Sequence, residues 1–233
     1  MLAVLLGTGI ASFQPCLAAT SDRTKHLTVS AFGGYQTYAM SDVNRAIGFT
    51  LASFPGSQAH KSEIKSGAGF GGALRVWPSD RAFASLEFQR LLASNSGSGT
   101  YLGSNYTVDL DVPANSVTMS AGYVPRPGSA LRFGLSGGVG YYVTTGHVVT
   151  KGPGINDTSN LEGSGFGAHG FGLVMARLRG KLDVEVDAGY RYAKTTDVTS
   201  GGFRIRNADG SLAKIDWSGF MGRAGLTFWA TDR

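Results

Sequence analysis

The sequence predicts an all-β fold, an eight-stranded antiparallel up-and-down transmembrane β-barrel with four long external loops. Two observations lead to this fold. Apolar and polar residues alternate in successive stretches, and the connections between these stretches alternate between long and short. The clearest stretch is Ala130–Tyr142, whose odd positions from Leu131 are mostly apolar and whose even positions from Arg132 are mostly small, polar or charged. In a membrane barrel the apolar face meets lipid and the polar face fills a narrow lumen.

The composition suits such a barrel. Of 233 residues, 35 are glycine, about twice the usual share, and only 16% are charged. The mean hydropathy is −0.02, and past residue 20 no run approaches the ~18 apolar residues of a spanning helix. We therefore expect one domain that crosses the bilayer with strands. The alternative fold is a soluble calycin-like barrel, which would hide its apolar face inside.

The N-terminus resembles a secretory signal, because an apolar segment is followed by small residues suited to cleavage. We expect residues 1–19 to be the signal peptide and residues 20–233 to be the barrel domain. An anchoring helix is the alternative, but Gln14 and Pro15 interrupt it. Cys16 is the only cysteine and would leave with the signal, so the mature chain would hold no disulfide and no cysteine-ligated metal.

The first four strands are predicted at Leu27–Tyr38, Ile64–Trp77, Ala82–Leu92 and Tyr106–Val124. The first three carry apolar residues at alternate positions. In the fourth, the apolar residues change from even to odd positions near Pro113. A bulge or a strand end there would reconcile the two parities.

The last four strands are predicted at Ala130–Tyr142, Gly163–Arg177, Leu182–Tyr192 and Ile215–Trp229. The sixth is the least regular, because glycines recur in it, and we expect Phe171, Leu173 and Met175 on its lipid side. In the seventh, apolar even positions oppose three carboxylates at odd positions. The eighth sets apolar even positions against Arg223 and Thr227.

The lengths of the connections indicate which end of the barrel is periplasmic and which is external. The short turns follow Trp77, Val124 and Arg177, while the four long loops are Met40–Glu63, Ala93–Asn105, residues 143–162 and Ala193–Lys214. Outer-membrane barrels have short periplasmic turns and long external loops. In the first long loop, Ser41 or Asp42 would cap a helix of one or two turns.

Aromatic residues at the strand ends are expected to mark the two membrane interfaces. The periplasmic set comprises Trp77, Tyr123 and Phe228, and the outer set comprises Tyr35, Tyr106, Tyr141, Tyr190 and Trp217.

Charged residues inside the strands are predicted to form a network in the lumen. They are Arg75, Glu87, Asp109, Asp111, Arg132, Asp183, Glu185, Asp187, Arg191 and Arg223, with the two aspartates of the fourth strand nearer the outer rim. One arginine facing lipid at the midplane would cost ~2–4 kcal/mol, so these side chains are expected to face inward. The network could line an ion path or close the lumen, and the small width of an eight-stranded barrel favours closure.

The glycine-spaced strands, the run GYRYAK at Gly189–Lys194 and the closing WSGFMGRAGLTFW resemble the small outer-membrane β-barrels of Gram-negative bacteria, the OmpA-transmembrane-domain, OmpX and OmpW-like group. The resemblance implies the cell outer membrane as the location. Assembly of such barrels is said to depend on a terminal aromatic residue, whereas here Ala230–Arg233 follow Trp229.

We expect no catalysis, no cofactor and no metal. The histidines are scattered at His26, His60, His147 and His169, and only His169 lies in a strand, without a carboxylate on its face. The expected role is structural or surface interaction through the external loops. The alternatives are a narrow pore for small or hydrophobic solutes and, less favoured, an enzyme that modifies lipid A.

The expected partners are outer-membrane lipid and lipopolysaccharide, with host or envelope surface ligands as further candidates. Loop cations that could bind lipopolysaccharide phosphates are Arg45, Lys61, Lys151, Lys194, Arg204, Arg206 and Lys214. No nucleic-acid partner is expected, and the protein is expected to be a monomer.

Overall fold

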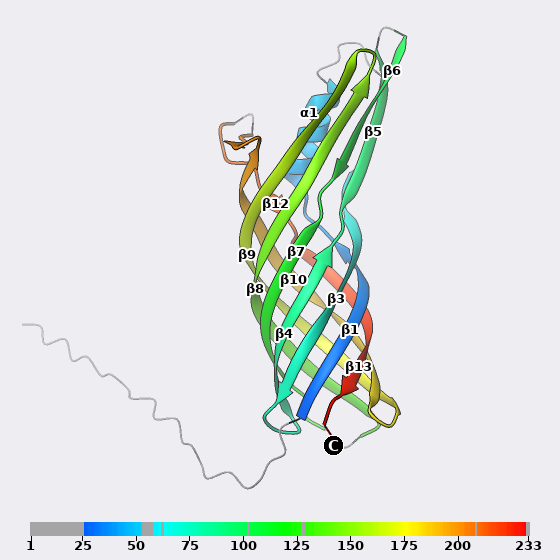
Figure 1. Ribbon diagram of the computed structural model, residues 1–233, viewed down its shortest axis with the longest axis vertical. Helices are drawn as coiled ribbons and strands as arrows, with labels where there is room; N and C mark the ends of the chain where they lie inside the picture. The colour runs from blue at the N-terminus through cyan, green and yellow to red at the C-terminus, as the bar shows by residue number, and fades with distance from the viewer. Residues whose placement is uncertain are drawn as a thin grey trace, which may run out of the picture.

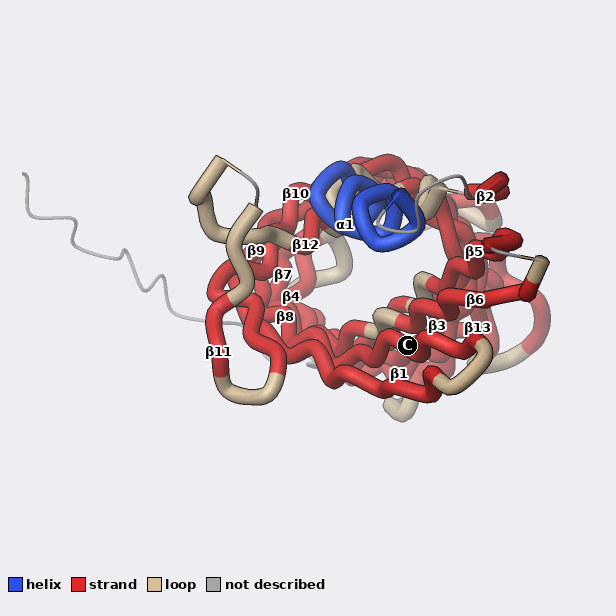
Figure 2. The backbone as a smooth tube through the Cα atoms, turned by 90° about the horizontal axis from the view of Figure 1, so that it is seen from above, coloured by secondary structure: helices blue, strands red, loops and turns tan. Residues whose placement is uncertain are grey.

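The computed structural model describes residues 26–231, except 53–57, 62, 102, 127–128 and 208. The predicted signal peptide at 1–19 lies outside the described residues. Eight antiparallel strands form a closed ring (Figures 1 and 2), because each pairs with the next and β13 pairs with β1. In ring order they are β1 (His26–Thr37), β3 (Ser66–Trp77), β4 (Ala82–Leu91), β7 (Ala114–Tyr123), β8 (Leu131–Gly152), β9 (Ile155–Arg179), β10 (Leu182–Ser200) and β13 (Gly219–Trp229).

The lower barrel has an apolar exterior and a polar interior. Leu135, Phe220 and Met119 point outward and are 71%, 70% and 68% exposed. Arginines and carboxylates alternate with them and are buried inside. A monomeric soluble protein rarely exposes an apolar surface of this extent, so the exterior is suited to lipid. The alternative of a soluble calycin-like barrel is therefore wrong.

Two ends can be distinguished. The turn end comprises the short connections at 78–81, 124–130 and 177–182. The loop end comprises residues 38–65, 91–113, 143–163 and 193–218. It holds α1 (Ser41–Ala52), β2 (Gln58–Lys61), β5 (Ser94–Tyr101), β6 (Ser104–Asp111), β11 (Phe203–Arg204) and β12 (Ile215–Asp216).

Much of the loop end is strand rather than loop. β8 and β9 pair without interruption from Leu131↔Ala176 to Gly152↔Ile155, and β5 and β6 form a second hairpin that pairs with β8 through β6. Serine, threonine and glycine alternate with valine here, which permits a sheet to continue into water. The predicted loops at 93–105 and 143–162 are therefore mainly hairpin extensions.

The interior changes from polar to apolar near Pro113, which ends β6 and separates it from β7. Even positions point inward on both sides of the break: Ser116 and Thr118 below it, and Val108 and Leu110 above it are all buried. The strand end predicted at Pro113 is confirmed. The predicted change of face is wrong, because the same face stays inside and its surroundings change.

The buried apolar cluster of the loop end includes Tyr38, Met40, Tyr106, Val108, Leu110, Val112, Tyr142, Val198, Ile215 and Trp217. A polar exterior surrounds it, with exposed residues such as Ser96, Asp109 and Lys151. This is the arrangement of a water-soluble barrel. The loop end therefore projects from the bilayer.

Helix α1 lies across one side of the mouth of the ring (Figure 2). Its 12 residues make about three turns, longer than predicted. The Asn44 side chain donates to the Ile64 carbonyl oxygen over 3.0 Å and accepts from the Ile64 amide over 2.8 Å, which fixes the helix to the segment before β3. Among the described residues, no helix is long and apolar enough to cross a bilayer.

A second apolar cluster closes the turn end and corrects the predicted faces of β9. Leu173 and Met175 are buried with Trp77, Phe83, Val124 and Trp229, and Phe171 is buried in the lumen. These three β9 residues were expected to face lipid. Leu173 and Met175 face inward because the turn end needs large side chains to fill it. The glycines of β9 have no side chains, so the alternation that would show which face meets lipid is weak in this strand.

The glycines leave space where neighbouring strands cross closely. We expect Gly34→Ala to destabilise the barrel by about 1–3 kcal/mol, as overpacking does, because its Cβ would lie 2.2 Å from the Gly222 carbonyl oxygen. Gly222→Ala is the matched control, since a Cβ there meets nothing within 4 Å. Urea unfolding in lipid vesicles measures both, and equal midpoints would contradict the packing argument.

Candidate functional site

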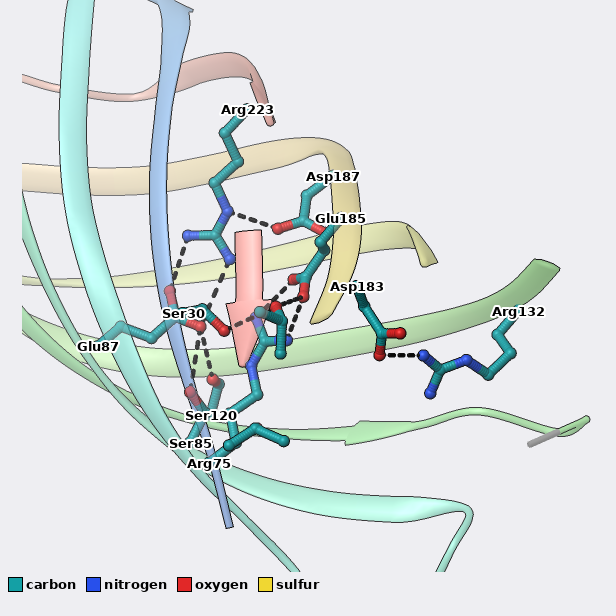
Figure 3. A network of polar contacts seen from close by, with 12 residues as sticks. Ser30, Arg75, Ser85, Glu87, Ser120, Arg132, Asp183, Glu185, Asp187 and Arg223 are labelled. Atoms are coloured by element: carbon teal, nitrogen blue, oxygen red, sulfur yellow. Dashed lines mark hydrogen bonds and ion pairs between the residues drawn. The ribbon is translucent and has the colours of Figure 1, made fainter. Parts of the chain in front are cut away.

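Three groups of ion pairs fill the lower lumen (Figure 3). Near the turn end, Arg132 binds Asp183, which also accepts a hydrogen bond from the Trp229 indole over 2.5 Å. Above it, Arg75 makes a bidentate pair with Glu185, at 2.5 and 2.6 Å. The first pair joins β8 to β10, which are separated only by β9, and the second joins β3 to β10 across the lumen.

The third group centres on Arg223. Its guanidinium donates to Glu87 Oε2 and to Asp187 Oδ2, both over 2.7 Å. The Phe32 and Phe171 rings lie on it, each with its centroid 4.3 Å from Cζ. The arginine is therefore satisfied at its edge by carboxylates and on its faces by aromatic rings. This contact explains why Phe171 faces inward.

Hydroxyl groups complete the network. Thr227 donates to Glu185 Oε2 over 3.0 Å, and Ser85 and Ser120 donate to Glu87 Oε1 over 3.4 Å. These hydroxyls add hydrogen bonds to carboxylate oxygens that also accept from Arg75 or Arg223. The four carboxylates are thus held by both charge and hydrogen bonds.

Arg191 lies above these groups and has a different environment. It donates to Gln36 Oε1 over 2.6 Å and to the Trp217 carbonyl oxygen over 2.9 and 3.0 Å. The rings of Tyr38 and Tyr142 lie 5.9 Å from its Cζ. Within the described part of the chain it makes no ion pair. Arg191 therefore marks the boundary between the charged lumen and the apolar interior of the loop end.

The structure places the ten predicted lumen residues as follows. Eight are buried inside the barrel: Arg75, Glu87, Arg132, Asp183, Glu185, Asp187, Arg191 and Arg223. Asp109 and Asp111 do not join them, because both lie at odd positions of β6, where Asp109 is exposed and Asp111 is half-buried. Odd positions of β6 point to the polar exterior of the loop end, so placing these two aspartates in the lumen was wrong.

Five of the eight predicted interface aromatics are exposed on the barrel exterior: Tyr35, Tyr123, Tyr141, Tyr190 and Phe228. Trp77, Tyr106 and Trp217 are buried inside instead, which corrects the prediction. Trp77 donates to Thr28 Oγ1 and Trp217 donates to Thr144 Oγ1, each over 3.1 Å. A tryptophan with an internal acceptor can be buried fully, and Tyr106 packs in the apolar cluster of the loop end.

The loop end contains a cavity of about 470 Å³ that sequence reasoning missed. It lies between α1, the extended strands and the segment 205–215. Its apolar lining comprises Val43, Ala46, Val108, Leu110, Val148, Leu161, Val198, Ile205, Ala213 and Ile215. The sequence feature that could have indicated this cavity is the run of apolar residues at even positions of β6, before Pro113. This volume and lining are typical of a site for a small apolar ligand.

The cavity is also lined by polar residues: Arg45, Arg206, Lys214, Asp42, Asn207, Thr150, Ser159 and Ser200. Asp42 Oδ2 accepts from the Asn207 side-chain amide and from the Lys214 backbone amide, both over 3.2 Å. The one carboxylate is therefore engaged by protein donors. The three cations give this part of the cavity a positive charge.

The segment beside this cavity is held by a local turn. Asp209 accepts hydrogen bonds from the Ser211 hydroxyl over 2.6 Å and from the Ser211 amide over 2.9 Å. These bonds hold the pKa of the Asp209 carboxyl below its usual value. Asp209 therefore stays ionised and keeps the turn formed at neutral pH.

The histidines do not converge. His169 is half-buried in the lumen beside Phe171, and its Nε2 has no hydrogen-bond partner. His26 lies at the turn end, with Nε2 3.9 Å from Asp80. His60 is in β2 and His147 is in β8. Over the described ranges, no three histidine or acidic residues gather as a metal site would require.

No protein-family model and no curated protein matches the sequence. Among solved structures, a major outer membrane protein of Thermus thermophilus is 12% identical, with 89% of this chain and 100% of that chain covered and a TM-score of 0.52. OprG of Pseudomonas aeruginosa is 14% identical, covering 91% and 99%, with a TM-score of 0.47. Neisserial surface protein A is 13% identical, covering 87% and 96%, with a TM-score of 0.43.

These likenesses concern the fold. The Thermus protein shares the barrel architecture over nearly the whole chain, and the predicted resemblance to small outer-membrane barrels is confirmed at that level. Together with the apolar exterior, the fold places the protein in the outer membrane. The turn end then faces the periplasm and the loop end faces outward.

We expect Arg223→Met to destabilise the barrel by about 3–5 kcal/mol, because it leaves two buried carboxylates without their cation. Urea unfolding in vesicles of neutral lipid measures the change. Arg126→Met removes an exposed arginine from the β7–β8 turn, and it is expected to shift the free energy of unfolding by less than about 0.5 kcal/mol. A loss of similar size in both variants would show that the network does not stabilise the fold.

Proposed function

We propose that this outer-membrane barrel has a closed lumen and acts at the cell surface, where the cavity of the loop end binds an amphiphile with an acyl chain and an anionic headgroup. The observation that carries the proposal is the cavity itself, apolar in its lining and bordered by three cations. The apolar wall would take the chain, and Arg45, Arg206 and Lys214 would bind a carboxylate or phosphate.

Closure of the lumen is part of the proposal. Three groups of ion pairs and two apolar clusters occupy the interior of the described barrel. An eight-stranded barrel has room for little more than its own side chains. To pass from the cavity to the turn end, an apolar solute would have to leave the apolar lining and move through the charged groups that lie beneath Arg191. This transfer is unfavourable.

Lipopolysaccharide and other acyl-chain lipids of the surface are the ligand class that fits, with host or envelope surface ligands as further partners. Two of the predicted loop cations are engaged within the protein: Lys194 pairs with Asp216 at 3.3 Å and Arg204 with Asp197 at 3.4 Å. At the cavity, Arg45 also pairs with Asp42 at 3.8 Å, and Arg206 donates to the Gly210 carbonyl oxygen over 2.7 Å. The cavity cations are candidates for the headgroup because they border its apolar lining. We further propose a monomer whose residues 1–19 are removed on export.

The pore for hydrophobic solutes is the second candidate function, favoured by the apolar cavity facing the exterior. We propose no enzymatic role. His169 lies far along the barrel from the cavity lining, and its Nε2 has no hydrogen-bonded carboxylate to orient it.

The closed lumen predicts no large, steady single-channel conductance in planar bilayers. An open porin inserted under the same conditions serves as the positive control. Steady conductance from the folded protein would contradict closure and favour the pore.

The cavity predicts binding of dansyl-undecanoic acid, seen as enhanced and blue-shifted dansyl emission. Val148→Phe should weaken binding at least about tenfold, because the ring fills space beside Leu110 and Leu161. Val149→Phe is the matched control, since the adjacent residue lies on the opposite face of β8. Unchanged binding in Val148→Phe, with the barrel folded, would exclude the cavity as the site.

A further inference from the structure

The net charge of the protein is concentrated at the turn end. The lumen holds four buried arginines and four buried carboxylates, so its charges balance. At the loop end, eight cations (Arg45, Lys61, Lys65, Lys151, Lys194, Arg204, Arg206 and Lys214) accompany nine carboxylates (Asp42, Glu63, Asp109, Asp111, Asp157, Glu162, Asp197, Asp209 and Asp216). The excess of positive charge in the described barrel must therefore lie elsewhere.

It lies in a cationic rim formed by Arg81, Arg126, Arg177, Arg179 and Lys181. All five are exposed. They come from the β3–β4, β7–β8 and β9–β10 connections and from the last residues of β9, which all lie at one end of the barrel (Figure 1). The only acidic residue exposed with them in the described turns is Asp80. The rim is therefore strongly positive around the barrel, not on one side of it.

The described residues leave part of the rim without an ion-pair partner. Asp80 lies 3.9 Å from His26 Nε2. Asp183 is within 4.0 Å of Arg177 Nε but is buried and bound to Arg132. Over the described ranges, Arg81, Arg126 and Arg179 make no ion pair. At least three guanidinium groups are thus available to an external anion.

Neighbouring residues place the rim at the depth of lipid headgroups. Tyr123 and Phe228 end their strands on the barrel exterior and are each 50% exposed, and Leu131 and Leu178 are 48% and 56% exposed. Aromatic residues mark the membrane interface, and leucines exposed beside the rim indicate that lipid reaches this level. The arginines directly beyond them would meet phosphate groups.

We propose that the cationic rim binds the phosphates of anionic phospholipids in the periplasmic leaflet. A guanidinium group pairs with phosphate through two parallel hydrogen bonds, and basic residues beside a bilayer are attracted to anionic lipid. The balanced charge of the loop end gives the opposite leaflet no equivalent attraction. The rim would thus hold a shell of anionic lipid and fix the depth of the barrel.

The test uses the protein folded in nanodiscs of phosphatidylcholine and phosphatidylglycerol, with the bound lipid identified by native mass spectrometry. We expect phosphatidylglycerol to be retained preferentially, by roughly fivefold for each cation that engages a headgroup. The preference should fall as salt is raised, because these exposed charges are screened. Equal retention of the two lipids at low salt would overturn the proposal.

Matched triple variants locate the effect. Arg81→Gln, Arg126→Gln and Arg179→Gln together should sharply reduce the preference, leaving only what Arg177 and Lys181 contribute, while Lys65→Gln, Lys151→Gln and Arg204→Gln remove the same charge from the loop end and should retain it. Folding of each variant is checked by heat-dependent gel mobility. A preference that is unchanged in the rim variant, or that falls equally in both, would contradict the assignment.

The cationic rim could instead bind the phosphate groups of a soluble anion. Soluble polyphosphate is added to the protein in phosphatidylcholine nanodiscs, and binding is measured by calorimetry. Binding to the rim tighter than to phosphatidylglycerol would assign it to a soluble polyanion and overturn the lipid proposal. Weaker binding supports the lipid, which is presented at the correct depth.

Discussion

The interior of an eight-stranded barrel is so narrow that every polar side chain inside it must find its partner there. In a bilayer the ring must close, because an unpaired strand edge would leave amide and carbonyl groups without hydrogen bonds. Closure then brings side chains from opposite walls together. Arg223 of β13 thereby reaches Glu87 of β4 across the lumen, while it also binds Asp187 on the neighbouring strand β10. Glycines admit this crowding, as at Gly34, where a Cβ would meet the backbone of β13.

The same strands serve two solvents. In the membrane-spanning part, on the turn side of Pro113, the inward face of the sheet is polar and the outward face is apolar. In the loop end the inward face is apolar and the outward face is polar. Long strands such as β8 pass through both zones without a change in pairing. The sequence therefore sets the position of the bilayer boundary, because the apolar residues change there from outward to inward positions. Arg191 lies at this boundary, with a polar contact to Gln36 and aromatic neighbours above.

Alternation and turns were enough to predict the eight strands, their order and the inward direction of eight charged residues, because a charge facing lipid is excluded on energy alone. They were not enough to predict which aromatic residues face the lumen and which face lipid. Trp77 and Trp217 are amphipathic, so either face suits them, and only a partner across the lumen (Thr28 or Thr144) decides it. Alternation and turns also could not reveal the cavity. The apolar residues Val108 and Leu110 were expected to face lipid after a change of parity, whereas they point into an interior that is apolar at the loop end.

Retaining charges in the lumen has a physical reason beyond stability. Replacing a buried ion pair with well-packed apolar residues is often neutral or stabilising, so stability alone does not explain Arg75 and Glu185. Strands apolar on both faces, however, would approach the continuous apolar run of a spanning helix. In β10, the carboxylates between Leu182 and Ala188 interrupt such a run. The apolar side chains of each strand therefore form a continuous apolar surface only when the ring closes.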